Sequence, residues 1–286
     1  MVGSGVSVRR DGGLVLPAVA VVAVLLIAPL LLVGDESLRL FVPGHVGSVH
    51  GAPLTLQNYV ELVRPAYARY FADTFRISFI ATLIALLLAY PIGYRVAREA
   101  RPRVRRAWIA FLVVMLFLSI LIRVYSVSLA VGPAGFGRGL AELFGLSLNS
   151  RGYAELSIVF GLLHCLVPMA AIVLLAPLQA LNPRLVEAAQ ALGAPTWKAH
   201  ATITLPLSAR GVLAAFMLCF TFSISAFVIP LVLGKGRVLF VSNLIYSRFG
   251  EIGNYPGGAA LSIALLTLSL IVVYALGRAA GSRWEK

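Results

Sequence analysis

The chain has 286 residues, of which 60% are hydrophobic and only 12% are charged. Soluble domains carry about 25% charged residues, so this composition excludes an ordinary soluble protein and predicts one embedded in a membrane. The formal net charge is +13, but the arginines flank apolar runs and form no soluble basic face with interleaved aromatics. The charge therefore argues against a nucleic-acid partner and favours contact with anionic membrane lipid.

Six apolar runs are long enough to cross a hydrocarbon core about 30 Å thick, which takes roughly 20 helical residues. They are residues 14–33, 75–94, 108–125, 156–176, 211–233 and 259–276. The first run follows two arginines, as a secretory signal would, but it is longer than a signal's apolar stretch and no Ala-x-Ala cleavage site follows. We therefore expect it to be retained as a helix. The prediction is a single all-α transmembrane domain over residues 1–286, with six transmembrane helices.

The connections between the runs predict the orientation. If the amino terminus is cytoplasmic, the connections 95–107 and 177–210 and the carboxyl tail lie on the same side. The first of these holds six arginines and one glutamate, as expected for a cytoplasmic loop. Both termini are therefore predicted to be cytoplasmic. The connections 34–74 and 126–155 lie on the other side and contain short helical patterns at 56–63 and 140–146.

The polar segment 182–206, between the fourth and fifth runs, contains two short helical patterns that form an elbow. Asn182 and Pro183 are suited to begin the first helix, and Gly193 is suited to end it. Thr196 can cap the second helix, which leads to Leu205 and Pro206. An ordinary amphipathic connector lying on the bilayer would share part of this pattern.

The spacing of seven residues in this segment is more specific than an amphipathic pattern. It resembles the EAA loop of permease subunits of binding-protein-dependent ATP-binding-cassette (ABC) importers. The matching residues are Glu187, Ala188, Ala189, Gly193, Ile203, Leu205 and Pro206.

The resemblance extends from about residue 70 to residue 276 and is greatest to the spermidine/putrescine branch, which also contains iron(III) and phosphonate relatives. It rests on the segments 123–125, 177–183, 226–230, 233–234, 243–246 and 254–260. The relatives often have Trp-Pro where this chain has Tyr255-Pro256, and a bulkier residue at Gly257. The resemblance to this branch indicates a polyamine as the solute. The departure at Tyr255-Pro256 and Gly257 leaves iron(III), phosphonate or another small solute as alternatives.

This resemblance implies the type I (MetI-like) ABC-importer permease fold and an assembly in the bacterial inner membrane. The partners would be two ATP-binding subunits that use ATP and Mg, a second and related permease subunit, and an extracytoplasmic solute-binding protein. The elbow would dock in a groove of the ATPase, with Glu187 and Gly193 central. The chain itself would bind no cofactor and catalyse no reaction. Replacing either central residue is expected to uncouple transport and leave the spans folded.

Candidate residues for the solute pathway are polar or aromatic and lie around the third and fifth runs, although interhelical hydrogen bonding would use the same residue types. They are Ser126, Ser128, Thr221, Ser223, Ser225, Phe227, Asn243 and Tyr246. Arg123 is expected either to face a cavity or to snorkel. His164 is expected to be a hydrogen-bonded packing residue, and the two cysteines to be apolar filler.

Two other functional classes are compatible with a basic helical bundle. An ion-coupled secondary transporter usually has ionisable residues or inverted repeats at the membrane midplane, and the sequence shows no carboxylate within a run and no convincing repeat. A membrane-embedded metalloenzyme is disfavoured because the four histidines are scattered and have no metal-ligand spacing. If the solute is a polyamine, its charges must be met by aromatic faces, carbonyls or partner subunits.

Overall fold

The computed structural model describes residues 12–49 and 51–281, which form helices joined by turns. Within these residues the β-structure is limited to two isolated bridges, Arg39 with Leu54 and Phe41 with Ser48. The all-α class is thus confirmed. The chain divides into two compact units, one made of residues 1–64 and 245–264, and the other of residues 65–244 and 265–286.

The first unit contains α1 (Gly12–Ser37), α2 (Gln57–Leu62), the π-helical turn η2 (Ser247–Glu251) and the beginning of α14 (Tyr255–Gly281). Polar contacts organise the segment between α1 and α2. The Ser37 hydroxyl lies 2.7 Å from the Tyr59 hydroxyl, and the Asn58 amide donates to the carbonyls of Ser37 and Arg39. The Gly47 N–H donates to the Gly253 carbonyl at 2.8 Å. These bonds supply partners for a backbone that lacks regular structure.

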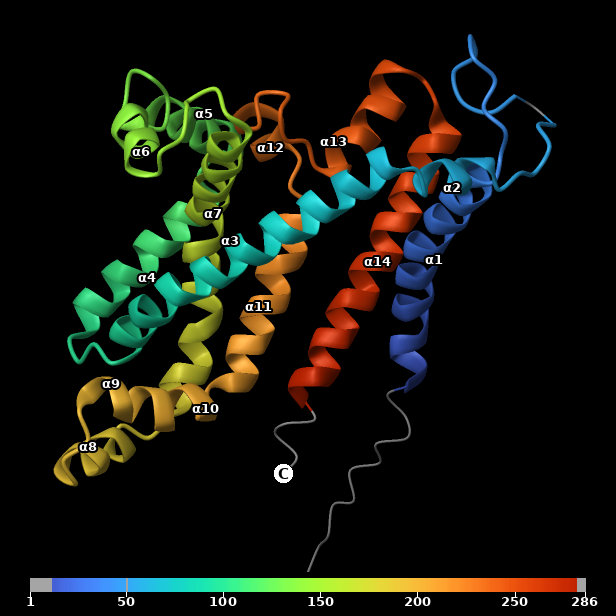
Figure 1. The fold of residues 1–286 in the computed structure, drawn as a ribbon. Helices are drawn as coiled ribbons and strands as arrows, with labels where there is room; N and C mark the ends of the chain where they lie inside the picture. Colours follow the sequence, from blue (N-terminus) through green and yellow to red (C-terminus); the bar gives the residue numbers. More distant parts are fainter. Residues whose placement is uncertain (1–11, 50, 282–286) are drawn as a thin grey trace, which may run out of the picture. The chain divides into compact units, whose positions relative to one another are not determined.

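The second unit is a helical bundle around α7. Its members are α3 (Pro65–Ala97), α4 (Pro102–Phe117), α5 (Ile120–Ala130), α6 (Gly137–Leu143), α7 (Arg151–Ala180), α8 (Arg184–Ala191), α9 (Thr196–Ala199), the π-helical turn η1 (His200–Thr204), α10 (Leu205–Leu207), α11 (Ala209–Ile224), α12 (Val228–Leu233) and the end of α14. The helix α13 (Val241–Tyr246) crosses the boundary between the units. Figure 1 shows α5 and α6 at one end of α7, and α8 and α9 at the other end.

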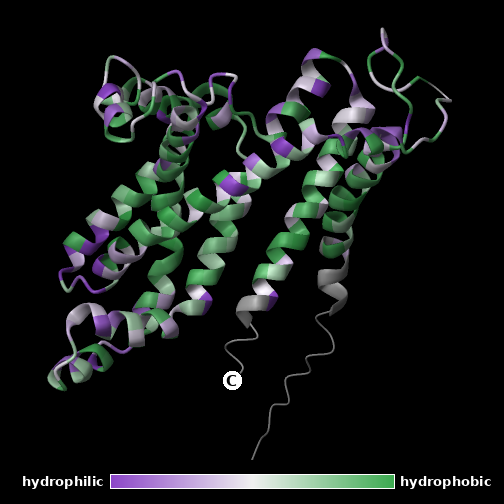
Figure 2. Ribbon diagram, in the orientation of Figure 1, coloured by the Kyte–Doolittle hydropathy of each residue, from purple (hydrophilic) through white to green (hydrophobic). Residues whose placement is uncertain are grey.

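Close packing of α3 on α7 forms the centre of this bundle. Ala81, Ala85 and Ala89 repeat every four residues along α3, and each is fully buried. Gly93 continues the row, and a methyl group there would lie 3.4 Å from the Ala171 carbonyl oxygen. In lipid, where apolar contact alone gives little driving force between helices, rows of small residues let two backbones approach and pack. Figure 2 shows hydrophobic residues along most of α7 and α11, as a membrane interior requires.

Membrane spans can be assigned by length and composition within the described residues. Four helical stretches qualify alone: Val19–Ser37, Pro65–Ala97, Arg151–Ala180 and Tyr255–Arg278. The total reaches six if each of two bent pairs is counted as one span: α4 with α5, at 93°, and Thr196–Leu207 with α11, at 75°.

Two of the predicted runs differ from the observed helices. The run 108–125 was expected to be one helix, but it is interrupted at Leu118 and Ser119, which have extended ψ values of 133° and 134°. The run 211–233 was expected to continue to Leu233, but α11 ends at Ile224. No proline or glycine occurs at either break. Side-chain hydrogen bonds stabilise both breaks, and a hydropathy pattern does not report such bonds.

Candidate functional site

The first arm of the elbow is α8, and local hydrogen bonds define both of its ends. The Asn182 carboxamide oxygen accepts the Arg184 N–H at 3.1 Å, and α8 begins at Arg184, one residue later than predicted. At the other end, the Gly193 N–H donates to the Gln190 carbonyl at 2.9 Å and the Ala194 N–H donates to the Ala189 carbonyl at 3.0 Å. This pair of bonds is the Schellman motif, which needs a left-handed residue after the helix. Gly193 supplies it, with φ of +87°.

The second arm consists of α9, η1 and α10. Thr196 is its first helical residue, whereas the sequence predicted a cap, and the Thr196 hydroxyl instead accepts from the Gln190 side chain of the first arm at 3.3 Å. The arm continues to Leu207, beyond the predicted end at Leu205 and Pro206. Pro206 is tolerated because it lies in the first turn of α10. The chain then bends at Ser208 into α11.

The inner side of the elbow is attached to the end of α3. The His200 ring meets the Tyr94 ring edge-on, with centroids 4.6 Å apart, and the Ser208 hydroxyl lies 3.2 Å from the Tyr90 hydroxyl. The Arg98 guanidinium donates to the Leu181 carbonyl at 2.7 Å, just before the elbow. Sequence reasoning missed these residues. Tyr90, Tyr94 and Arg98 are spaced four residues apart along α3 and the residue that follows it, and this spacing is the signal that could have identified them.

The elbow is also attached to α7 and α11. A methyl group on Gly211, near the start of α11, would lie 2.4 Å from Cγ of Pro177, near the end of α7. Ala199 is fully buried, and Thr204 and Ser208 are nearly so. The inner side of the elbow is therefore attached to α3, α7 and α11 at one end of the unit. A displacement of the elbow must shift these helices too, because packed side chains are not continuously deformable.

The outer side of the elbow is exposed. Leu192 is 90% exposed and Trp197 is 72% exposed. Of the predicted coupling residues, Glu187, Ala188, Gly193 and Leu205 are also exposed, whereas Ala189, Ile203 and Pro206 are partly buried. Within the described residues, no hydrogen bond or ion pair involves the Glu187 carboxylate. Large exposed apolar side chains beside a free carboxylate are typical of a surface that binds a protein partner.

Comparison with known proteins identifies the family that carries this elbow. Residues 89–285 match the family described as binding-protein-dependent transport system inner membrane component. The chain belongs to this family. It is a permease of a binding-protein-dependent ABC importer, a multi-pass protein of the inner membrane and a transport subunit, not an enzyme.

Two relatives carry the same permease name. The spermidine/putrescine transport system permease protein PotB of Haemophilus influenzae is 31% identical over 229 residues, which cover 79% of this permease and 80% of that protein. PotB of Escherichia coli is 27% identical over 236 residues, which cover 81% and 86% of the two chains. The predicted membership of the spermidine/putrescine branch agrees with these relatives.

A solved structure shows the same fold. It is a chain of a bacterial alginate ABC transporter, in complex with an alginate pentasaccharide-bound periplasmic protein. The two chains superpose with a TM-score of 0.75 at 17% identity, over 98% of this permease and 97% of that chain. The similarity confirms the predicted ABC-permease fold.

The predicted pathway residues are in several different environments. Ser126, Thr221 and Ser225 are exposed, and Ser128 and Phe227 are partly buried. Tyr246 belongs to the other compact unit. An exposed face of α11 contains Leu218, Thr221 and Phe222 and continues to Ser225, the residue that follows the helix. This face presents two hydroxyls and an aromatic ring, which could line a route.

Two other predicted pathway residues are buried. The Asn243 amide bridges two backbone segments: its oxygen accepts the Phe240 N–H and its nitrogen donates to the Phe227 carbonyl, each at 3.0 Å. These bonds stabilise the turn after α11, which is the physical reason for the early end of that helix. The Ser223 hydroxyl is fully buried and has no hydrogen-bond partner among the described residues.

Arg123 is turned into the bundle, and only 5% of it is exposed. Its guanidinium donates to the Met115 carbonyl in the last turn of α4 and to the Cys165 sulfur at 3.3 Å. It therefore neither snorkels nor faces open solvent. The cation satisfies a carbonyl that the end of α4 leaves without a helical partner, and it stabilises the break at residues 118–119. Both cysteines are buried and free.

His164 differs from the expectation for a packing residue. Its Nδ1 atom is buried and has no hydrogen-bond partner in the described part of the chain, although a hydrogen-bonded role was predicted. No three His, Cys, Asp or Glu side chains among residues 12–49 and 51–281 are grouped to hold a metal ion. His164 is therefore an isolated polar group in an apolar wall.

An ionic cluster lies at the end of the bundle opposite the elbow. Asp73 and Glu155 interact with Arg76 and Arg151, with the shortest Arg76 to Glu155 distance at 2.7 Å. This pairing explains why α3 and α7 extend beyond their apolar runs. A hollow of about 320 Å³ beside the cluster is lined by Arg69, Arg237, Tyr70 and other residues. In the described residues no acidic partner pairs with Arg69 or Arg237, so the hollow is positively charged.

Proposed function

We propose that this permease forms half of a solute route and is driven by two separate ATP-binding subunits, which bind the elbow, residues 182–206. The observation that supports this proposal is the two-sided elbow. Its outer side offers Glu187, Leu192 and Trp197, and its inner side is packed on α3, α7 and α11. ATP and Mg would be used by those partners. A second, related permease subunit would complete the route.

The coupling follows from differential binding. A ligand shifts a conformational equilibrium only as far as it binds one state better than the other. ATP-driven closure of the partners would move Glu187 and Gly193 at the contact, and the buried Ala199 and the partly buried His200 would transmit the displacement to Tyr94. The seven residues of the EAA pattern are our proposed coupling residues. In this arrangement the elbow and both termini are cytoplasmic.

The proposed solute is a polyamine, and the two relatives named as spermidine/putrescine permeases support this proposal. The carboxylates of Asp73 and Glu155 are already paired with arginines. We therefore propose that the cationic solute is accommodated by hydroxyl, aromatic and carbonyl groups such as Thr221, Phe222 and Ser225, together with the second permease. Ser126, Ser128, Ser223, Phe227, Asn243 and Tyr246 remain further pathway candidates.

Reconstitution tests both parts of this proposal. The permease and its copurifying partners would be placed in liposomes with the solute-binding protein, and uptake of radiolabelled spermidine and putrescine would be measured with and without ATP. We expect uptake that requires both ATP and the ATPase subunits. Equal uptake without them would contradict the coupling role and favour a secondary transporter. ATP-driven uptake of iron(III) or a phosphonate, with no polyamine uptake, would contradict only the solute.

The basic hollow at the opposite end is proposed to meet an acidic surface of the solute-binding protein. We expect Arg237→Glu to weaken association with the solute-binding protein, because a negative side chain in the hollow would repel the acidic surface that the arginine attracts. The binding-protein affinity of the reconstituted permease should fall by about tenfold or more at low salt, and the difference should shrink at high salt as the charges are screened. Lys235→Glu, on the same turn but outside the hollow's lining, is the matched control. An equal loss in both variants would contradict a specific role for the hollow.

A further inference from the structure

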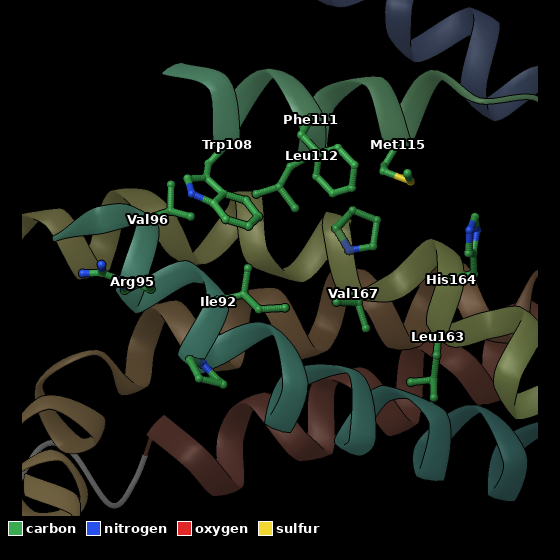
Figure 3. A pocket seen from close by; sticks show the side chains of 12 residues that line it. Ile92, Arg95, Val96, Trp108, Phe111, Leu112, Met115, Leu163, His164 and Val167 are labelled. Carbon is green, nitrogen blue, oxygen red and sulfur yellow. The ribbon is translucent and has the colours of Figure 1, made fainter. Parts of the chain in front are cut away.

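A cavity of the bundle lies between α3, α4 and α7 (Figure 3). Its volume is about 650 Å³. The walls are almost entirely apolar and include Ile92, Phe111, Leu112, Met115, Leu163 and Val167. A cavity of this kind offers water few hydrogen-bond partners, so an apolar occupant is favoured.

The cavity extends along the membrane-spanning direction of α4. Its lining on α4 runs from Trp108 to Met115, a rise of about 10 Å along the helix. Figure 3 shows Arg95 and Trp108 toward one end of the cavity and Met115 and His164 toward the other. The Arg95 end is near the connection between α3 and α4, on the same side of the bundle as the elbow. Tryptophan and arginine at this level are typical of a membrane interface, with the apolar core beyond them.

The charge at the Arg95 end is strongly positive. The Arg95 side chain is 76% exposed, and its guanidinium forms an ion pair with the Glu99 carboxylate at 3.7 Å. The connection 95–107 holds six arginines and this one glutamate. Arg101 and Arg103 are exposed there as well. An apolar cavity with a cationic opening is complementary to a molecule with hydrocarbon chains and an anionic head.

We propose that this cavity binds an anionic phospholipid. An acyl chain of the lipid lies between α4 and α7, and its phosphate lies against the Arg95 guanidinium. The lipid fills the space that α4 leaves beside α7 and covers the half-exposed rings of Trp108 and Phe111. It thereby supports α4 up to its break, where Arg123 binds the Met115 carbonyl. The site is independent of which solute the permease carries.

Quenching of Trp108 fluorescence by brominated lipid tests the proposal. The chain has three tryptophans, and Trp197→Phe with Trp284→Phe leaves Trp108 as the sole emitter. The complete transporter carrying this permease would be reconstituted into phosphatidylcholine containing brominated phosphatidylglycerol or brominated phosphatidylcholine at equal mole fraction. Tryptophans of the partner subunits would be replaced likewise. We expect the brominated anionic lipid to be preferred by about fivefold, the factor for one arginine near an anionic headgroup.

Arg95→Gln should abolish this preference, whereas Arg210→Gln, an exposed arginine at the start of α11, should preserve it. Each variant must elute from size exclusion as the parent complex does. Equal quenching by the two lipids in the parent would show unselective lipid contact and overturn the proposal. Absence of quenching by either lipid would show that protein, such as the second permease, covers the cavity, and would also overturn it. Retained preference in Arg95→Gln would refute the role of Arg95.

Discussion

Replacing Gly193 by aspartate is expected to abolish ATP-driven uptake and to leave the helical bundle folded. The residue has φ of +87°, a conformation that costs an L residue about 1–2 kcal/mol. No atom lies within 4 Å of an added side-chain carbon, so a steric clash does not contribute. The new carboxylate would lie at the carboxyl end of α8, where the peptide dipoles already concentrate negative charge. It would also add a charge to the proposed ATPase contact.

Two further substitutions separate these effects. Gly193→Asn has nearly the shape of aspartate, is neutral and tolerates the left-handed conformation, so it should retain most of the uptake. Gly193→Ala carries the backbone strain without the charge and should be intermediate. Uptake, stimulated ATPase activity and thermal unfolding would be measured for each reconstituted variant. Normal uptake by correctly inserted Gly193→Asp protein would rule out the proposed coupling role of this turn.

Gly211→Ala is expected to destabilise the bundle and reduce uptake together. Its methyl group would lie 2.4 Å and 2.6 Å from two ring carbons of Pro177. A proline ring cannot rotate away as a flexible side chain can, so α7 and α11 must separate. Overpacking of this kind typically costs about 1–3 kcal/mol. Because the contact lies where the elbow enters α11, the separation should also weaken transmission from the elbow.

The matched control is Gly139→Ala in α6. No atom lies within 4 Å of an added methyl group at Gly139, and alanine favours a helix. Its thermal unfolding midpoint should equal or exceed that of the parent, whereas the Gly211→Ala midpoint should be lower in the same detergent. If Gly211→Ala left the midpoint unchanged, the close approach of α7 and α11 would not be a determinant of stability.

The elbow could be predicted from sequence because its geometry is local. Asn182 and Gly193 lie at the ends of α8, where side-chain and backbone bonds span only a few residues. The attachment of the elbow could not be predicted in this way. The contacts of His200 with Tyr94 and of Ser208 with Tyr90 join residues more than a hundred positions apart. A local pattern carries no information about which distant ring a histidine meets.

The breaks in the third and fifth runs could not be predicted from a local sequence pattern either. Hydropathy predicts that a segment is buried in lipid, and 108–125 and 211–233 are apolar throughout most of their length. It does not predict whether the backbone stays helical, because a carbonyl freed by a break can be satisfied by a remote donor. Arg123 is that donor for Met115, whereas the Phe227 carbonyl accepts both the Leu231 N–H and the Asn243 amide.

The sequence by itself determined the membrane class, the family and the local form of the elbow, because composition, spacing and helix-end chemistry act over short stretches of chain. Only the tertiary structure decided which side of the elbow is buried, where α4 and α11 end, and that Arg123 points inward. These features depend on packing and hydrogen bonds between different helices. Their free energy exists only after α3, α7 and α11 have come together.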